Sequence, residues 1–362
     1  MRTANYQLRP HVSALDGLRG LACLMVVFYH NFPILHNYLF FAWLSMDIFF
    51  VLSGYLITDI LCKTIGTENY LRNFYARRLL RVFPLYYAAI FLFLVLLPTF
   101  FQMPFKIDYF TGNQIYFWLF LQNWLLIFNK TDQSFLNHLW SMAVEEQFYL
   151  LWPLVFAFIR KPKVLITLLI VLLLSFVTLR FWLWNSQLSN LPYFSFYSFT
   201  RIDGICIGCM IGLLQNTNTK FVEKYTAFIV LFFAAVNFIF YFINKQVGHS
   251  IPYLLVGYST FSMLFGLLLY DLLNHKNSLF SKFFNNRLLR FVGTISYGTY
   301  IFHWPVYLIL NYYLVRWLNL NAGDFNSQIF TSVFATMLSF VIGYLSYRYF
   351  EMRFLKLKKY FN

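Results

Sequence analysis

The stretch SALDGLRGLACLMVVFYHN, residues 13–31, decides how this chain folds. It is apolar enough for a membrane helix, yet it contains Asp16, Arg19 and His30. Ionisable side chains in a membrane helix usually face the bundle interior or a watery cavity and mark a functional site. Eleven residues separate Arg19 from His30, so on a helix both project from one face, about 16 Å apart along the axis. We therefore expect this face to line the protein's interior.

A structural interpretation of these two residues also exists. A histidine can be satisfied by a neighbouring helix, and an arginine near a helix end can extend its charged group to the membrane surface. Other polar residues along the chain favour the functional interpretation, because they fall at the ends of predicted spans or within them.

The composition is that of an integral membrane protein. Of 362 residues, 60% are hydrophobic and 11% are charged, whereas about a quarter are charged in a soluble domain. No polar stretch is long enough for a separate soluble domain, so we expect one all-α membrane domain over residues 11–356 and a short basic cytoplasmic tail over 357–362. The net charge of +15 lies mainly in short loops, where the positive-inside rule explains it without a nucleic-acid partner.

Ten apolar segments are long enough to cross a bilayer, which takes about 20 residues per helix. All basic loops fall on the cytoplasmic side if a further short segment near 115–128 is re-entrant or interfacial. The sequence thus predicts about ten transmembrane helices in the cytoplasmic (inner) membrane, with both termini cytoplasmic. The ten segments lie near residues 14–34, 39–62, 82–101, 146–160, 163–184, 198–214, 225–243, 252–273, 293–315 and 328–350.

Charged residues flank two of these spans. Arg78 and Arg81 are three residues apart and share a helix face, and guanidinium groups bind phosphate in bidentate fashion. A loop that only sets topology would show the same charges. Glu145 and Glu146 stand at the outer end of a span, and consecutive helical residues point about 100° apart, so we expect at most one of them to face a cavity squarely.

Further polar residues interrupt later apolar segments. Arg201, Asp203 and His303 are the ones for which we expect contact with a substrate. The C-x-x-C at 206–209 is more typical of small residues that pack a helix than of a metal or redox site. No clustered set of metal ligands and no Gly-rich phosphate loop is present in the sequence, so we expect no metal.

Three glycines recur at a spacing of four residues, at Gly204, Gly208 and Gly212. On a helix this spacing places them on one face, and small residues on one face let a neighbouring membrane helix approach closely. We therefore expect a packing surface here.

These residues fit two classes of function. In acyl transfer to a hydroxyl, a histidine takes the acceptor's proton and cationic groups hold a phosphate-bearing carrier such as coenzyme A. The same groups suit a transporter or flippase for an anion or a lipid-linked saccharide. Transporters often contain repeated halves, and no second half resembling the first is visible in the sequence.

Several stretches resemble the successive signature segments of the membrane-bound acyltransferase-3 family. LDGLRGLACLMVVFYH contains an arginine followed by ten residues and a histidine, and RRLLR contains R-x-x-R. HLWSMAVEEQFYLLWPL, RIDGICIGCMIG, SYGTYIFHWPV and YRYFEMRFLK follow in the expected order. The resemblance runs from about residue 11 to 356.

The resemblance implies ten membrane helices and an O-acyltransferase. Such a protein moves an acyl group, most often acetyl, from cytoplasmic acyl-CoA to a hydroxyl of a surface, lipid-linked or exported glycan. Its implied site comprises the base His30, the further catalytic residues Arg19 and Glu145, the donor-binding pair Arg78 and Arg81, and the acceptor-binding Glu146.

Some members of the family carry an additional esterase-like domain outside the membrane. This sequence ends at Asn362 without one, so we expect it to modify its acceptor directly or to use a separate extracytoplasmic partner. The difference disfavours the peptidoglycan-modifying, two-domain type. A small-molecule acceptor fits the sequence as well as a glycan does.

Overall fold

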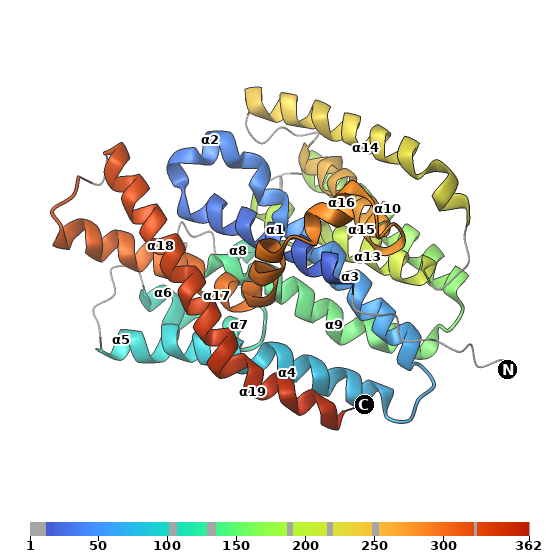
Figure 1. Ribbon diagram of the computed structural model, residues 1–362, viewed down its shortest axis with the longest axis horizontal. Coiled ribbons are helices and arrows are strands. Elements are labelled where there is room, and N and C mark those ends of the chain that lie inside the picture. The colour runs from blue at the N-terminus through green and yellow to red at the C-terminus, as the bar shows by residue number, and fades with distance from the viewer. Residues whose placement is uncertain are drawn as a thin grey trace.

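The computed structural model describes residues 12–100, 107–128, 135–186, 191–215, 220–247, 253–321 and 324–361. Over these residues every regular element is helical and no strand occurs, as the sequence predicts (Figure 1). The long helices are α1 (Ser13–Asn31), α3 (Ser45–Thr64), α4 (Tyr70–Phe91), α9 (Trp140–Phe158), α10 (Pro162–Asn185), α13 (Asp203–Leu214), α14 (Lys220–Val247), α15 (Tyr258–Asn274), α17 (Arg287–Trp317) and α18 (Phe325–Leu345).

Short helical elements connect or extend the long ones. Three of them, η3, η5 and η6, are π-helical and continue a neighbouring helix. The short elements are η1 (Pro33–Leu35), α2 (His36–Leu39), η2 (Phe40–Leu44), η3 (Leu92–Leu96), α5 (Leu97–Phe100), α6 (Ile107–Gly112), α7 (Gln114–Trp118), α8 (Gln122–Phe128), η4 (Asn137–Leu139), α11 (Leu191–Phe196), α12 (Ser198–Arg201), η5 (Tyr253–Gly257), α16 (Leu279–Phe284), η6 (Ser346–Glu351), α19 (Met352–Leu355) and η7 (Lys356–Tyr360).

The protein is a multi-pass membrane protein. Among the described residues, five continuous helical segments are long and apolar enough to cross a bilayer by length and composition. The crossing of all ten segments and the cytoplasmic position of both termini stay predictions. The five segments are Phe41–Thr64, Tyr70–Phe100, Pro162–Asn185, Leu254–Asn274 and Phe325–Tyr360.

The segment near 115–128 differs from the single short helix that we predicted. It forms two helices, α7 and α8, separated by Phe120, whose φ of 54° lies in the left-handed region and interrupts the helix. At about 1.5 Å per residue, neither helix is long enough to span a bilayer. Gln122 and Asn123 of α8 are buried and hydrogen-bond to the Leu139 carbonyl and to Ser198, so α8 is anchored within the protein.

The predicted segment 198–214 is also divided. α12 ends at Arg201 and α13 begins at Asp203, and both of these residues are buried and ion-paired to other helices. α13 alone is about 18 Å long, shorter than the roughly 30 Å hydrocarbon core.

α1 lies in the interior of the bundle, as expected, and packs most extensively against α17. A Cβ atom added to Gly20 would overlap the carbonyl oxygen of Leu289, and one added to Gly293 would overlap that of Asp16. The two backbones thus touch with no side chain between them, the packing that small residues permit between membrane helices.

The glycine-rich face of α13 packs against α3, which confirms the prediction for this face. A Cβ atom at Gly208 would overlap the carbonyl oxygen of Val51, and one at Gly54 of α3 would overlap that of Ile205. Cys206 and Cys209 are buried free thiols in the same helix.

At the periphery, α14 runs along one edge of the bundle beside α15, and α4 runs beside the C-terminal α19 (Figure 1). The apolar side chains of α14 include the exposed Phe228, Leu231 and Phe238, which is the pattern of a lipid-facing helix. The core that positions the site is therefore made by α1, α3, α4, α9, α13 and α17.

We predict that Gly293→Ala destabilises the protein. Alanine is favoured over glycine in a helix by about 1 kcal/mol, but its methyl group would overlap the Asp16 carbonyl, and overpacking typically costs about 1–3 kcal/mol. Thermal unfolding in detergent measures the difference. Gly112→Ala is the matched control, because no atom lies within 4 Å of the Cβ position there; equal stability of the two variants would contradict close α1–α17 packing.

Candidate functional site

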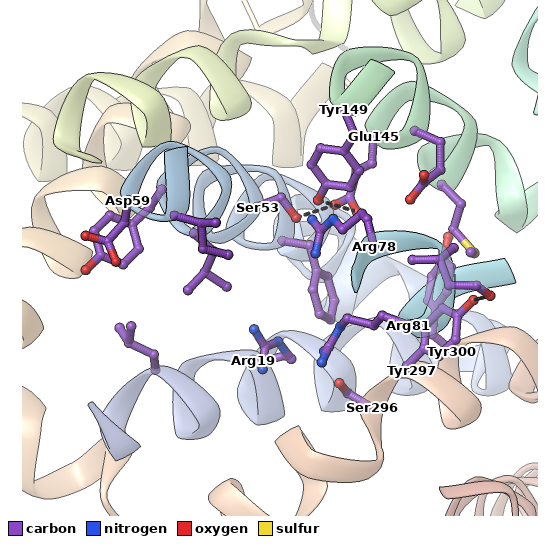
Figure 2. A pocket seen from close by; sticks show the side chains of 18 of the residues that line it. Arg19, Ser53, Asp59, Arg78, Arg81, Glu145, Tyr149, Ser296, Tyr297 and Tyr300 are labelled. Atoms are coloured by element: carbon purple, nitrogen blue, oxygen red, sulfur yellow. Dashed lines mark hydrogen bonds between the residues drawn. The ribbon is translucent and has the colours of Figure 1, made fainter. Parts of the chain in front are cut away.

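A cavity of about 460 Å³ lies between α1, α3, α4, α9 and α17. Figure 2 shows Asp59 at one end of this cavity and Tyr297 and Tyr300 at the other, with Arg19 and Arg78 between them. The cavity thus draws its lining from segments that are far apart in the sequence.

Five of the sequence-predicted residues line this cavity together: Arg19, Arg78, Arg81, Glu145 and Glu146. Both glutamates line it, although we expected at most one of them to face a cavity squarely. Ser141, Met142 and Tyr149 of α9 also line the cavity, so α9 contributes two consecutive positions on each of two turns and both glutamates are included.

Glu145 is held by two hydroxyl groups. Ser53 Oγ of α3 donates a hydrogen bond to Oε1 at 2.9 Å, and the Tyr149 hydroxyl, one turn along α9, donates to Oε2 at 3.2 Å. The Arg78 guanidinium lies over the Tyr149 ring, with Cζ 3.8 Å from the ring centre (Figure 2). This chain of contacts links α3, α4 and α9 through one carboxylate.

The cationic residues of the cavity differ in their partners. Arg19 Nη1 lies 3.2 Å from Asp16 Oδ1, one turn earlier on α1. Among the described residues, no carboxylate lies within 4.0 Å of the charged nitrogens of Arg78, Arg81 or Lys358. The Nε of Arg78 is buried and has no hydrogen-bond partner in the described part of the chain. Like charges held together in this way favour an anionic ligand.

His30 does not line the cavity. It lies beside His303 of α17, with His30 Nδ1 3.1 Å from His303 Nε2, and the His303 ring centre is 5.1 Å from that of His138. These three histidines connect to the cavity wall through Tyr300, whose carbonyl oxygen contacts His303 Nδ1 and whose hydroxyl bonds the His138 carbonyl. Arg19 and His30 therefore lie on one helix, but only Arg19 lines the cavity.

A proline explains how His138 is held. Pro305 lies inside α17 and has no N–H, so the carbonyl of Ile301, four residues earlier, lacks its usual helical donor. His138 Nε2 lies 3.2 Å from that carbonyl and supplies the missing hydrogen bond. The stretch SYGTYIFHWPV thus places His303 and the carbonyl that accepts the hydrogen bond of His138 on the same turn of α17.

Comparison with known proteins decides the family. Residues 12–360 match the family Acyl_transf_3, described as an acyltransferase domain. The chain belongs to the acyltransferase-3 family. The match covers nearly the whole chain, including α1 with its Arg19 and His30, the Arg78 and Arg81 pair and the His303 turn.

Two similar proteins are both named as O-acetyltransferases. The chain is 31% identical to "Peptidoglycan O-acetyltransferase OatA" of Listeria monocytogenes over 97% of its own length and 56% of that protein. It is 29% identical to "O-acetyltransferase OatA" of Staphylococcus aureus over 94% of its own length and 57% of that protein. The chain therefore spans little more than half the length of these relatives. No solved structure matches it.

Arg201 and Asp203 lie in a separate buried network and do not line the cavity, so the structure gives no support to substrate binding by them. Asp203 accepts two hydrogen bonds from Arg180 of α10, at 3.1 and 2.9 Å, and Arg201 Nη2 lies 3.4 Å from Asp47 Oδ2. Arg180 also donates to the carbonyls of Leu255 and Thr200 and to the Ser259 hydroxyl, so all five of its N–H groups are used. Such a network joins α3, α10, α13 and α15.

Sequence reasoning missed several residues that the structure brings together. Arg180 is the clearest, since a lone arginine in the apolar run of α10 signals a buried partner. Lys358 was counted in the basic tail, but it lines the cavity. Tyr149 and Tyr300 carried no signal, because tyrosine is abundant throughout the chain.

We predict that Ser53→Ala destabilises the protein by about 1.5–3 kcal/mol, because it removes a hydrogen bond to the Glu145 carboxylate. The unfolding free energy in detergent is the measurement. Ser175→Ala on the exposed face of α10 is the matched control, since that hydroxyl donates only to the Val171 carbonyl of its own helix. A loss no larger than in the control would show that Glu145 does not depend on Ser53.

Proposed function

We propose that this protein is a membrane O-acetyltransferase that moves an acetyl group from acyl-CoA, bound from the cytoplasmic side, to a hydroxyl of a glycan. The observation that carries the proposal is the cavity in which Arg19, Arg78 and Arg81 meet beside Glu145 within a membrane bundle. The family and the names of the relatives support the reaction class.

Acyl-CoA suits the charges of the cavity. Coenzyme A carries a pyrophosphate and a further phosphate, and guanidinium groups bind phosphate with paired, charge-assisted hydrogen bonds. Arg78 and Arg81 project from successive turns of α4, and Lys358 of η7 lines the same cavity. We assign the phosphates to this cluster and the acyl end of the donor to the wall near Tyr300 and Ser141.

His30 is the proposed base. It takes the proton of the acceptor hydroxyl, and the hydroxyl oxygen forms a bond to the acyl carbonyl carbon. The carbon–sulfur bond then breaks, and its electron pair leaves with the sulfur of coenzyme A, to which a proton returns. Arg19, about 16 Å away along the same helix, holds the donor. Glu145 accepts the hydrogen bond of the Tyr149 hydroxyl and so positions the ring over which the Arg78 guanidinium lies.

The acceptor is proposed to be a cell-envelope glycan. The name of the Listeria relative supports peptidoglycan as the acceptor, which our expectation from sequence had disfavoured. Mass spectrometry of surface glycans from cells with and without the protein tests this acceptor: loss of an acetyl group identifies a glycan product, and unchanged glycans point to a small-molecule acceptor. Acetylation of the glycan by the purified protein alone distinguishes direct modification from transfer through a separate extracytoplasmic partner.

We predict that His30→Ala lowers acylation of the acceptor by about 10²–10⁴-fold, the usual contribution of a general base. The rate of acetyl transfer by purified protein in proteoliposomes measures this. His275→Ala is the matched control, since His275 lies on an exposed loop beside Asp271. Full acylation by a normally folded His30→Ala protein would remove His30 from the mechanism.

We predict that replacing both Arg78 and Arg81 with alanine raises the KM for acyl-CoA at least about tenfold, because each charge-assisted hydrogen bond contributes about 1.5–3 kcal/mol. Arg77→Ala is the matched control, because Arg77 is exposed and does not line the cavity.

An unchanged KM in the double variant would mean that these arginines serve topology alone. Flux of solute across the vesicle membrane without consumption of the thioester would identify a transporter and overturn the proposed reaction.

A further inference from the structure

We propose that His303 is a positioning residue that fixes the tautomer of His30, so that the bare nitrogen of His30 is Nε2. The inference about the tautomer stands on geometry alone, and its catalytic consequence rests on the proposed function. It also gives His303 a different task from the substrate contact that the sequence predicted.

The hydrogen-bond pattern starts at a carbonyl oxygen. His303 is fully buried, and its Nδ1 lies 2.6 Å from the carbonyl oxygen of Tyr300. A carbonyl oxygen only accepts hydrogen bonds, so His303 Nδ1 carries the hydrogen. A neutral imidazole has one N–H, and His303 Nε2 therefore presents a lone pair.

That lone pair faces His30. The His30 Nδ1 atom lies 3.1 Å from His303 Nε2 and 3.0 Å from the carbonyl oxygen of Val26, one turn earlier on α1. Both neighbours are acceptors, so His30 Nδ1 must carry a hydrogen, shared between them. The opposite tautomer would direct the lone pair of Nδ1 at two other lone pairs.

The consequence concerns the second nitrogen of His30. With Nδ1 protonated, the neutral ring leaves Nε2 as its proton acceptor. When Nε2 takes a proton, Nδ1–H keeps the same two acceptors and its hydrogen bonds become charge-assisted. Partners of this kind commonly set which nitrogen of a reactive histidine is free.

Val26 alone is a weaker constraint than His303. Its carbonyl is the helical acceptor for the backbone N–H of His30, four residues later on α1, so it already holds one hydrogen bond. His303 Nε2 offers an undivided lone pair from another helix. The tautomer of His30 is therefore set across the α1–α17 contact.

A metal site is a different explanation for neighbouring histidines. Within the described residues, no group of three or more His, Cys, Asp or Glu side chains is arranged to hold a metal ion. His303 Nδ1 and His138 Nε2 are also directed at the carbonyls of Tyr300 and Ile301, which requires hydrogens on those nitrogens. The cluster is thus built from hydrogen bonds.

The test compares two substitutions of His303. In His303→Gln the amide oxygen reaches approximately the position of Nε2 and can accept the hydrogen of His30 Nδ1. In His303→Leu the volume is kept and the acceptor is lost. The glutamine variant keeps the proposal testable if the leucine variant fails to fold.

The first readout is ¹⁵N NMR of the full chain in lipid bilayers with ¹⁵N-labelled histidine, and His30→Ala assigns the His30 signals. We expect the Nδ1–H tautomer alone in the wild type and in His303→Gln, and a mixture that includes Nε2–H in His303→Leu. An Nε2–H signal from His30 in the wild type, or an unmixed Nδ1–H signal in a folded leucine variant, would overturn the proposal.

The second readout is acetyl transfer. His303→Leu should lower kcat about 10²-fold or more with the KM for acyl-CoA unchanged, since the donor cavity is not altered, and His303→Gln should restore kcat to within about tenfold of the wild type. Equal kcat in both variants would contradict a positioning role. If His30→Ala retained full activity, the proposed role of His30 as the base would fail while the NMR result on the tautomer would stand.

Discussion

Direct backbone contact between α1 and α17 is the constraint on which the rest of the site depends. Lipid tails are as apolar as the helix surfaces, so close packing has to hold membrane helices together. Gly20 and Gly293 allow the two backbones to touch. One helix of this pair carries Arg19 and His30, and the other carries Tyr300 and His303. Their close approach therefore brings the histidine pair within hydrogen-bond distance and closes one side of the cavity.

Charged residues of the interior are arranged in two ways. Around Arg180 and Asp203 every donor of the guanidinium is used and no solvent-exposed surface remains, as burial of charge requires. Around Arg78 and Arg81 the guanidinium groups lack a carboxylate within 4.0 Å among the described residues. The first arrangement holds helices together, and the second leaves binding capacity for a ligand.

Sequence patterns predicted the helical class and five residues of the cavity, because apolar length and isolated charges are strong signals in a membrane protein. The break at Ile202 was missed, since ion pairs to other helices, and no local breaker, divide the segment. Lys358 was missed because a basic residue that sets topology and one that binds phosphate are identical in sequence. The position of His138 depends on the Ile301 carbonyl that Pro305 leaves without a helical donor. The two segments meet only in the folded chain, so the sequence does not show this contact.

The cavity takes lining residues from α1, the first described helix, and from Lys358 in the last one. During synthesis α1 enters the membrane long before η7 has been made. Asp16 and Arg19 of α1 therefore lie in the bilayer before all of their neighbours in the cavity, including Lys358, have been made. The cavity is consequently complete only after residue 358 has been made and η7 has packed beside α4.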